Sequence, residues 1–170
     1  MSVEKMDKFR EKLEELKKAE LIKLTQKNLR GSLSDEPGVY VIYGGQDPKL
    51  PLYVGTTGDL ALRVGQIVNT VHFDHTFTWR LFWREAERMS GRNYNHDMLY
   101  EFWDSDAEGR EKVVEKIEKL LYEQLWFKCV ELSGWTKDER EKLEKIVQDE
   151  LKPLKPHLKK SEIPLDDLLR

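Results

Sequence analysis

Residues 38–63 read GVYVIYGGQDPKLPLYVGTTGDLALR, two short runs rich in Val, Ile and Tyr that are separated by turn-forming residues. Runs of this kind, bounded by Gly, Pro and Asp, are typical of strands joined in a hairpin. The sequence therefore predicts paired strands at residues 38–43 and 51–56. Asp59 is a favourable N-cap, so a helix is predicted over residues 59–68.

The predicted hairpin and helix bring together side chains that can act on phosphodiesters. Tyr40 and Tyr53 are expected beside each other on neighbouring strands, and Arg63 lies one turn into the helix that follows. A phenol can position or deprotonate water, and a guanidinium binds phosphate oxygens in a two-pronged geometry. The alternative is that both residues are ordinary strand tyrosines with hydroxyl groups at the surface.

Two more elements are predicted near the C-terminal end of the chain. Residues 126–132 alternate apolar and polar side chains and are expected to form a third strand. Thr136 and Glu139 have the spacing of a capping box, which predicts a helix over residues 136–151. The expected fold class is α/β (α+β), with a small three-stranded antiparallel sheet flanked by helices.

Gly38-Val39-Tyr40, Tyr53-Val54-Gly55 and an arginine eight positions after Gly55 form a pattern that resembles the GIY-YIG endonuclease superfamily. The resemblance implies a metal-dependent endonuclease that hydrolyses phosphodiester bonds in DNA. It implies that Tyr40 or Tyr53 activates or orients the attacking water, and that Arg63 neutralises charge on the phosphoryl oxygens. Which tyrosine acts as the base stays open.

The family also carries a metal-binding glutamate that is followed nine residues later by proline. Glu144, with Pro153 nine positions beyond it, resembles this carboxylate. The resemblance thus implies one Mg²⁺ (or Mn²⁺) bound by Glu144, and Mg²⁺ in phosphate-cleaving sites is commonly held by only one or two carboxylates. If Glu144 lay on the opposite face, Glu118 or Glu123 would be the replacement.

The chain departs from the family's pattern at two positions. Ile67 stands four residues after Arg63, where many members have His or Tyr, and Pro156 stands where the family usually has Asn. His72 or His75 is a candidate to take the place of the missing histidine. The same histidines, with the Asp between them, are a weaker candidate for a metal site, because three such residues in four positions are more often loop residues.

The chain divides into a core domain and additions. We expect an N-terminal amphipathic helix within residues 1–30, with its apolar pattern at residues 3–29, a nuclease-like domain at 31–158 and a tail at 159–170. Residues 69–125 form an insertion that is longer than a minimal family domain needs.

Three elements are expected within the insertion. Residues 77–88 and 106–124 have helical patterns, and residues 98–103 look like a short extended segment. The first helix carries a cluster of aromatic residues that favours a core position over a base-stacking platform: Trp79, Phe82 and Trp83.

The same helix carries an arginine stripe at i, i+4 and i+8, which places all three side chains on one face. This stripe and two lysines of the C-terminal region are candidate contacts to DNA: Arg80, Arg84, Arg88, Lys152 and Lys155. A solvated face is an equal alternative for the stripe. Acidic residues outnumber basic ones in residues 101–150, so we expect this segment to face away from nucleic acid.

Composition limits the classes of function. The net charge of −3 argues against a dominant nonspecific attraction to DNA, and no apolar run approaches the ~20 residues that span a bilayer. Cys129 is the only cysteine, which excludes an internal disulfide. We therefore expect a cytoplasmic protein without membrane contact, with a homodimer as one way to cut both DNA strands. The alternative function is a catalytically weak or inactive nucleic-acid-binding or assembly module.

Overall fold

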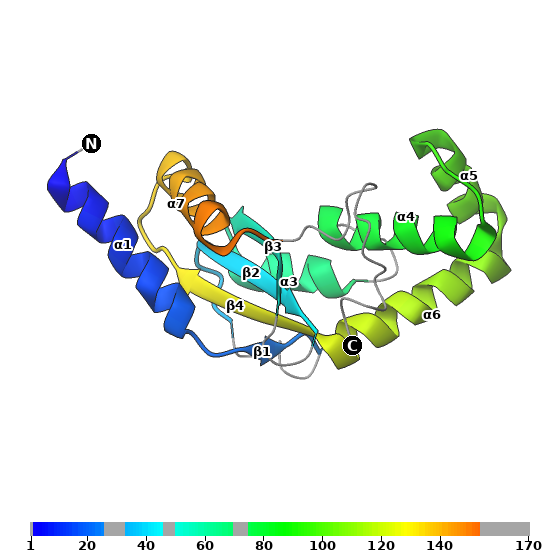
Figure 1. Cartoon of the computed structure of the whole chain (residues 1–170), viewed down its shortest axis with the longest axis horizontal. Coiled ribbons are helices and arrows are strands. Elements are labelled where there is room, and N and C mark those ends of the chain that lie inside the picture. Colours follow the sequence, from blue (N-terminus) through cyan, green and yellow to red (C-terminus); the bar gives the residue numbers. More distant parts are fainter. Residues whose placement is uncertain (1, 26–32, 46–49, 70–74, 154–170) are drawn as a thin grey trace.

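The computed structural model describes residues 2–25, 33–45, 50–69 and 75–153 (Figure 1). These residues form an α+β fold of six helices and four strands. In chain order the elements are α1 (Val3–Lys18), β1 (Ile22–Lys23), β2 (Gly38–Gly44), β3 (Leu50–Thr57), α3 (Leu60–Val68), α4 (Thr76–Ser90), α5 (His96–Ser105), α6 (Ala107–Gln124), β4 (Leu125–Glu131) and α7 (Lys137–Leu151).

The strands form one antiparallel sheet in the order β1-β4-β2-β3. The predicted hairpin is confirmed, because β2 and β3 pair as neighbours with Tyr40 opposite Gly55 and Ile42 opposite Tyr53. The prediction of three strands was wrong. Ile22 and Lys23 add a fourth strand by pairing with β4, which satisfies backbone groups that would otherwise be exposed along its edge.

The N-terminal helix is shorter than its apolar pattern suggests. α1 ends at Lys18 rather than continuing to residue 29, because the backbone is already extended at Ala19. The apolar residues that follow belong instead to the sheet: the backbone N–H of Leu24 donates to Leu125 O at 3.1 Å, and Leu24 is fully buried. Residues 26–29 of the predicted helix lie outside the described part of the chain.

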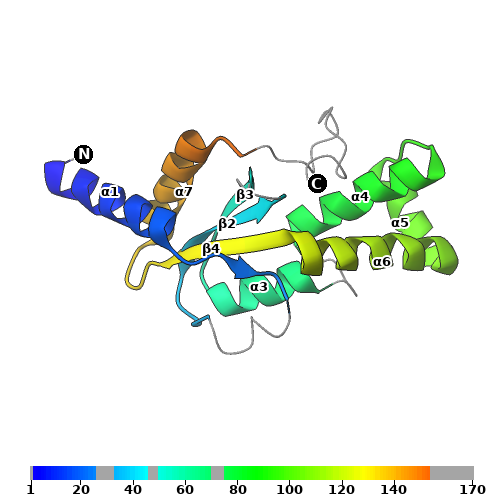
Figure 2. The ribbon, with the colours of Figure 1, turned by 60° about the horizontal axis from the view of Figure 1, so that its bottom comes forward.

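Both faces of the sheet are covered, so β2 is buried on both sides (Figure 2). Val39 and Val41 face a core made with α1 and α7. Tyr40 and Ile42 face the second core, to which α3, α4 and α6 contribute. The helices of the insertion extend beyond the end of the sheet that lies away from α1 (Figure 1).

One element of the insertion differs from its prediction. Residues 98–103 are helical within α5, not extended. The side chain of Asn95 accepts the backbone N–H of Met98 at 2.8 Å and so caps the helix, while Leu99 is fully buried and Phe102 packs against the same core. No helix within the described ranges is long and apolar enough to cross a membrane.

Candidate active site

Two glycines of the hairpin allow large side chains to approach the backbone. A Cβ atom on Gly55 would clash with the hydroxyl of Tyr40 and lie 2.5 Å from its Cζ atom. A Cβ atom on Gly38 would lie 2.5 Å from Val130 O and 2.7 Å from Leu60 Cδ1. Glycine is therefore required at both positions for steric reasons, and the Gly55 position lets the Tyr40 ring lie across the neighbouring strand.

Tyr40 and Tyr53 lie diagonally on one face of the hairpin, with their ring centroids 6.2 Å apart. Tyr40 stacks on Phe127 of β4 at 5.4 Å and is 1% exposed. Tyr53 is only partly buried and packs against Phe77 at 5.6 Å. The two phenols therefore differ in their access to solvent.

His75 connects this tyrosine pair to the insertion. It is the N-cap of α4 and is 2% exposed, and its Nε2 atom lies 2.8 Å from the Tyr40 hydroxyl oxygen. Its other ring nitrogen, Nδ1, accepts the backbone N–H of Phe77 at 3.1 Å. Ile67 is fully buried in the core, and it is His75, from the next helix, that reaches Tyr40. His72 lies outside the described residues.

Arg63 comes from α3, on the same face of the sheet as the tyrosines. Its side chain is half-buried, and its Nε atom is buried without a hydrogen-bond partner among the described residues. Burial raises the pKa of both Tyr40 and Tyr53, and the Arg63 guanidinium charge opposes that rise at both phenols. A buried N–H donor without a partner is costly, so this group is well suited to receive an anion.

Glu144 comes from α7, whose Leu143 and Val147 belong to the core on the other face of the sheet. Glu144 is half-buried, and its Oε1 atom accepts a hydrogen bond from Gln148 Nε2 at 3.0 Å. α7 nevertheless contacts β3, the strand of Tyr53. Burial is the main cause of the raised pKa of Tyr40 and of Tyr53, and the negative charge of Glu144 adds to it at both phenols.

Burial is the largest influence on the acidity of the tyrosine pair. It raises the pKa of both phenols above the ordinary value of 10.0, because the phenolate is poorly solvated there. The pKa of Tyr40, the more deeply buried phenol, is raised further than that of Tyr53. Tyr53 is therefore the phenol whose ionisation the surroundings oppose less.

The donor set limits the kind of metal site that the chain can form. No group of three or more His, Cys, Asp or Glu side chains that could hold a metal ion occurs in the described ranges. A site based on Glu144 would thus use no more than two such side chains of the described residues together with water and phosphate oxygens. Such a donor set fits Mg²⁺, which usually keeps several waters when it binds beside a phosphate.

No family model, curated protein or solved structure matches the chain.

The predicted DNA contacts on α4 have partners within the protein. Arg80 lies over the ring of Trp83 at 5.6 Å, and Arg88 Nε donates to the buried Glu85 Oε2 at 2.9 Å. Arg84 is half-buried. The positive charges of Arg80 and Arg88 thus interact with residues of the same helix. Lys152 ends α7 with a left-handed backbone (φ 47°), and Lys155 lies outside the described residues.

The aromatic cluster of α4 is part of the core, as predicted. Phe82 and Trp83 are 0% and 9% exposed. Trp79 stacks on Phe82 at 5.4 Å and on Tyr100 of α5 at 5.2 Å. These contacts attach α5 to α4, so the rings hold the insertion together.

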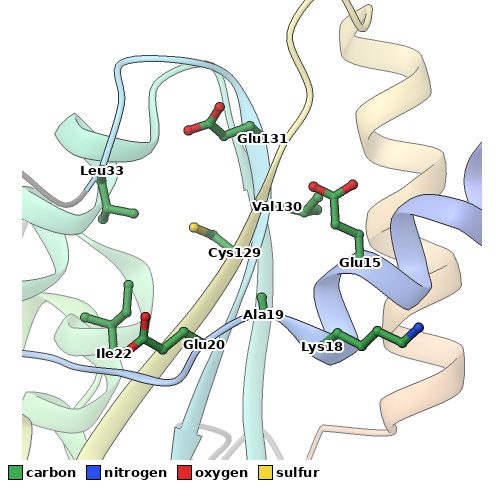
Figure 3. A pocket seen from close by; sticks show the side chains of 9 residues that line it. All are labelled: Glu15, Lys18, Ala19, Glu20, Ile22, Leu33, Cys129, Val130 and Glu131. Carbon is green, nitrogen blue, oxygen red and sulfur yellow. The ribbon is translucent and has the colours of Figure 1, made fainter.

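A pocket of about 510 Å³ lies elsewhere, between the end of α1, the segment that leads to β1, and β4 (Figure 3). Its lining is mixed, with carboxylates from Glu15, Glu20 and Glu131 and the thiol of Cys129. None of the predicted site residues lines it. It is therefore a separate feature of the surface.

Proposed function

We propose that the protein is a metal-dependent endonuclease that hydrolyses phosphodiester bonds in DNA, with a site similar to that of GIY-YIG nucleases. What supports the proposal is that the hairpin of Tyr40 and Tyr53 is contacted by both helices that carry the charged groups, α3 with Arg63 and α7 with Glu144. One cation, one carboxylate and two phenols in a single place are the groups that phosphodiester hydrolysis needs.

Each group has a distinct role in the proposed reaction. Glu144 would hold the metal, and Mg²⁺ or Mn²⁺ supplies a Lewis acid for the scissile phosphate when bound. Arg63 would donate to phosphoryl oxygens, since its buried Nε has no partner among the described residues. The phenols would orient or activate the attacking water.

DNA is the proposed partner, and any contact surface is local because the net charge is −3. The proposal gives each protomer one such site. Cleavage of both strands would then require a homodimer or two successive nicks.

A second function is favoured by one observation. Tyr40 is almost completely buried, and its pKa is raised by that burial, so this phenol is poorly suited to proton transfer. Together with Arg63 Nε, which has no hydrogen-bond partner in the described part of the chain, this environment also suits a module that binds nucleic-acid phosphates without cleaving them.

Nicking of supercoiled plasmid distinguishes the two functions. We expect cleavage with Mg²⁺ or Mn²⁺ and none with EDTA. Glu144→Gln should abolish turnover while DNA binding, measured by fluorescence anisotropy, persists. Glu141→Gln is the matched control, because Glu141 is exposed on the same helix.

Arg63→Ala should lower turnover by about 10²–10³-fold, because it removes a charged donor aimed at the transition state. Arg10→Ala, an exposed position on α1, is its control. If the wild type binds DNA but cleaves no duplex, branched or single-stranded substrate, the binding-module function replaces the endonuclease.

A further inference from the structure

We propose that the seam between α4 and α6 binds the phosphate backbone of duplex DNA at a distance from the cleavage site. This basic seam consists of two arginines of α4 and three lysines of α6: Arg84, Arg88, Lys112, Lys116 and Lys119. The choice of DNA as the ligand rests on the proposed nuclease function, whereas the arrangement of charges is a property of the described structure.

α6 carries its charges in two separate stripes. Its sequence repeats a Glu-Lys pair at residues 111–112, 115–116 and 118–119. In an α-helix, positions i, i+4 and i+7 lie on one face, and each single residue turns the chain by more than a quarter of a circle. The three lysines therefore form one stripe and the three glutamates form another. A helix whose charges nearly cancel thus has a basic side and an acidic side.

A buried carboxylate shows which side of α6 faces α4. Glu85 of α4 is fully buried, and its Oε2 atom lies 3.2 Å from Lys116 Nζ. Lys116 is the middle lysine of its stripe, so the basic side of α6 borders α4. The two helices lie side by side and extend together beyond the end of the sheet (Figure 1, Figure 2).

Glu85 also joins the cations of the two helices. Its Oε2 atom accepts a hydrogen bond from Arg88 Nε at 2.9 Å, in addition to its contact with Lys116. One negative charge thus holds two cations next to each other, which leaves an excess of positive charge. Both cationic side chains remain partly exposed. A guanidinium whose Nε binds a carboxylate retains two terminal amino groups that can donate to phosphate oxygens.

Neighbouring acids neutralise only part of the basic seam. Lys112 pairs with Glu108 at 2.8 Å, but both side chains are exposed, and such pairs are weak. Glu123 lies one turn after Lys119 and borders the end of the seam. Together with Glu85, three carboxylates stand against five cations. The seam is therefore locally positive although the whole chain has a net charge of −3, as a DNA ligand requires.

The basic seam is connected to the candidate active site through α4. The helix begins after its N-cap His75, whose ring contacts Tyr40, and Arg88 follows thirteen residues later. A rise of 1.5 Å per residue separates the two positions by about 20 Å. This distance corresponds to about six base pairs of duplex at 3.4 Å each. A duplex that contacts both regions thus extends about six base pairs beyond the cut.

Binding of a fluorescent DNA duplex in EDTA, measured by anisotropy, tests the seam without cleavage. The double variant Lys112→Glu/Lys119→Glu changes two exposed lysines and leaves the contacts of Glu85 intact. We expect its affinity to fall by at least about 10-fold, and the slope of log affinity against log salt to fall by about 2. Thermal melting establishes that the variant is folded.

Two control variants separate the seam from overall charge. Lys5→Glu/Lys18→Glu makes the same change in net charge at exposed positions of α1, at the other end of the molecule (Figure 1). Glu111→Gln/Glu115→Gln neutralises the acidic side of α6. We expect both to bind within about 2-fold of the wild type. Equal losses in the α1 and seam variants would show a nonspecific charge effect and overturn the proposal.

Nicking of supercoiled plasmid with Mg²⁺ separates the seam from the nuclease function. We expect the seam variant to raise KM. If the wild type binds duplex DNA through the seam but cleaves nothing, the nuclease function fails and the seam stands. If the wild type cleaves and the seam variant keeps the wild-type affinity and KM, the seam is overturned and the nuclease function stands. Tighter binding of duplex RNA than of duplex DNA would overturn DNA as the ligand.

Discussion

The ring of Tyr40 occupies the space that a side chain on Gly55 would need. This contact explains, in steric terms, why a glycine follows Tyr53-Val54 at the position paired with Tyr40. It also shows that the first tyrosine and the second tripeptide are parts of one packing unit. Gly55 of the motif is therefore required for packing.

Gly55→Ala should be strongly destabilising. The added Cβ would lie 2.5 Å from Tyr40 Cζ and 3.0 Å from Tyr40 Cε1, so the ring or the strand must move. We expect a loss of roughly 1–3 kcal/mol or more in the free energy of unfolding, measured by urea denaturation. Gly58→Ala is the control, since nothing lies within 4 Å of the added atom. Equal stabilities of the two variants would contradict the packing described here.

Tyr40 should also give the protein a characteristic alkaline instability. Its folded pKa is raised above 10.0, so its contribution to stability is complete below the unfolded pKa. Above about pH 10 the unfolded chain loses the phenol proton while the folded chain keeps it, and stability falls. The stability advantage of the wild type over Tyr40→Phe should therefore shrink as pH rises from about 9 to 11 in denaturant titrations. A constant difference would show that Tyr40 is not buried.

The start of α7 is fixed by hydrogen bonds between residues of its own first turn. The Thr136 side chain accepts the backbone N–H of Glu139 at 3.2 Å, and Glu139 accepts that of Thr136 at 3.0 Å. This reciprocal cap starts the helix that carries Glu144. The capping box was read from the sequence, and the structure confirms it because its hydrogen bonds need only residues within one turn.

Thr136→Ala should destabilise the protein by about 1 kcal/mol, since it removes one capping bond and leaves a backbone N–H without its acceptor. Ser2→Ala is a matched control, because Ser2 is the N-cap of α1 but its side chain makes no capping bond. Thermal melting compares the two. A loss in Ser2→Ala as large as that in Thr136→Ala would argue against the capping box as the cause.

The two faces of the sheet pack against different helices. One core joins the tyrosines to α3 and the insertion, and the other holds α1 and α7. α1 packs on the loop before α7, where Phe9 meets Trp135 edge to face at 5.2 Å and the Lys8 ammonium lies 4.0 Å from the Trp135 ring centroid. α1 therefore supports the helix that carries Glu144, although it contributes no residue to the site.

Phe9→Ala tests this support. Phe9 is 4% exposed, so its truncation should cost roughly 3–5 kcal/mol in the free energy of unfolding. Met6→Ala is the control on the same helix, because Met6 is 45% exposed. Chemical denaturation gives both values. If Phe9→Ala melts like the wild type, α1 is an independent arm and not part of the fold.

Elements whose signals are local were predictable from the sequence. The hairpin of β2 and β3 follows from two β-branched and aromatic runs around a turn, and α3 and α7 follow from Asp59 and Thr136 as caps. Strand alternation predicted β4. In each case the hydrogen bonds or the side-chain period lie within a few residues, so the amino-acid order alone determines them.

Other features depended on partners far away in the chain. Residues 22 and 23 form a strand, rather than part of a helix, because they pair with β4, which lies about a hundred residues later in the sequence. Residues 98–103 became helical because Leu99 could be buried in the core. His75 contacts Tyr40, which lies 35 positions away in the sequence. Ile67, the position expected for a polar residue, is buried in the core. Only tertiary packing could select among these outcomes, because the burial and hydrogen bonds that favour each one come from other elements of the fold.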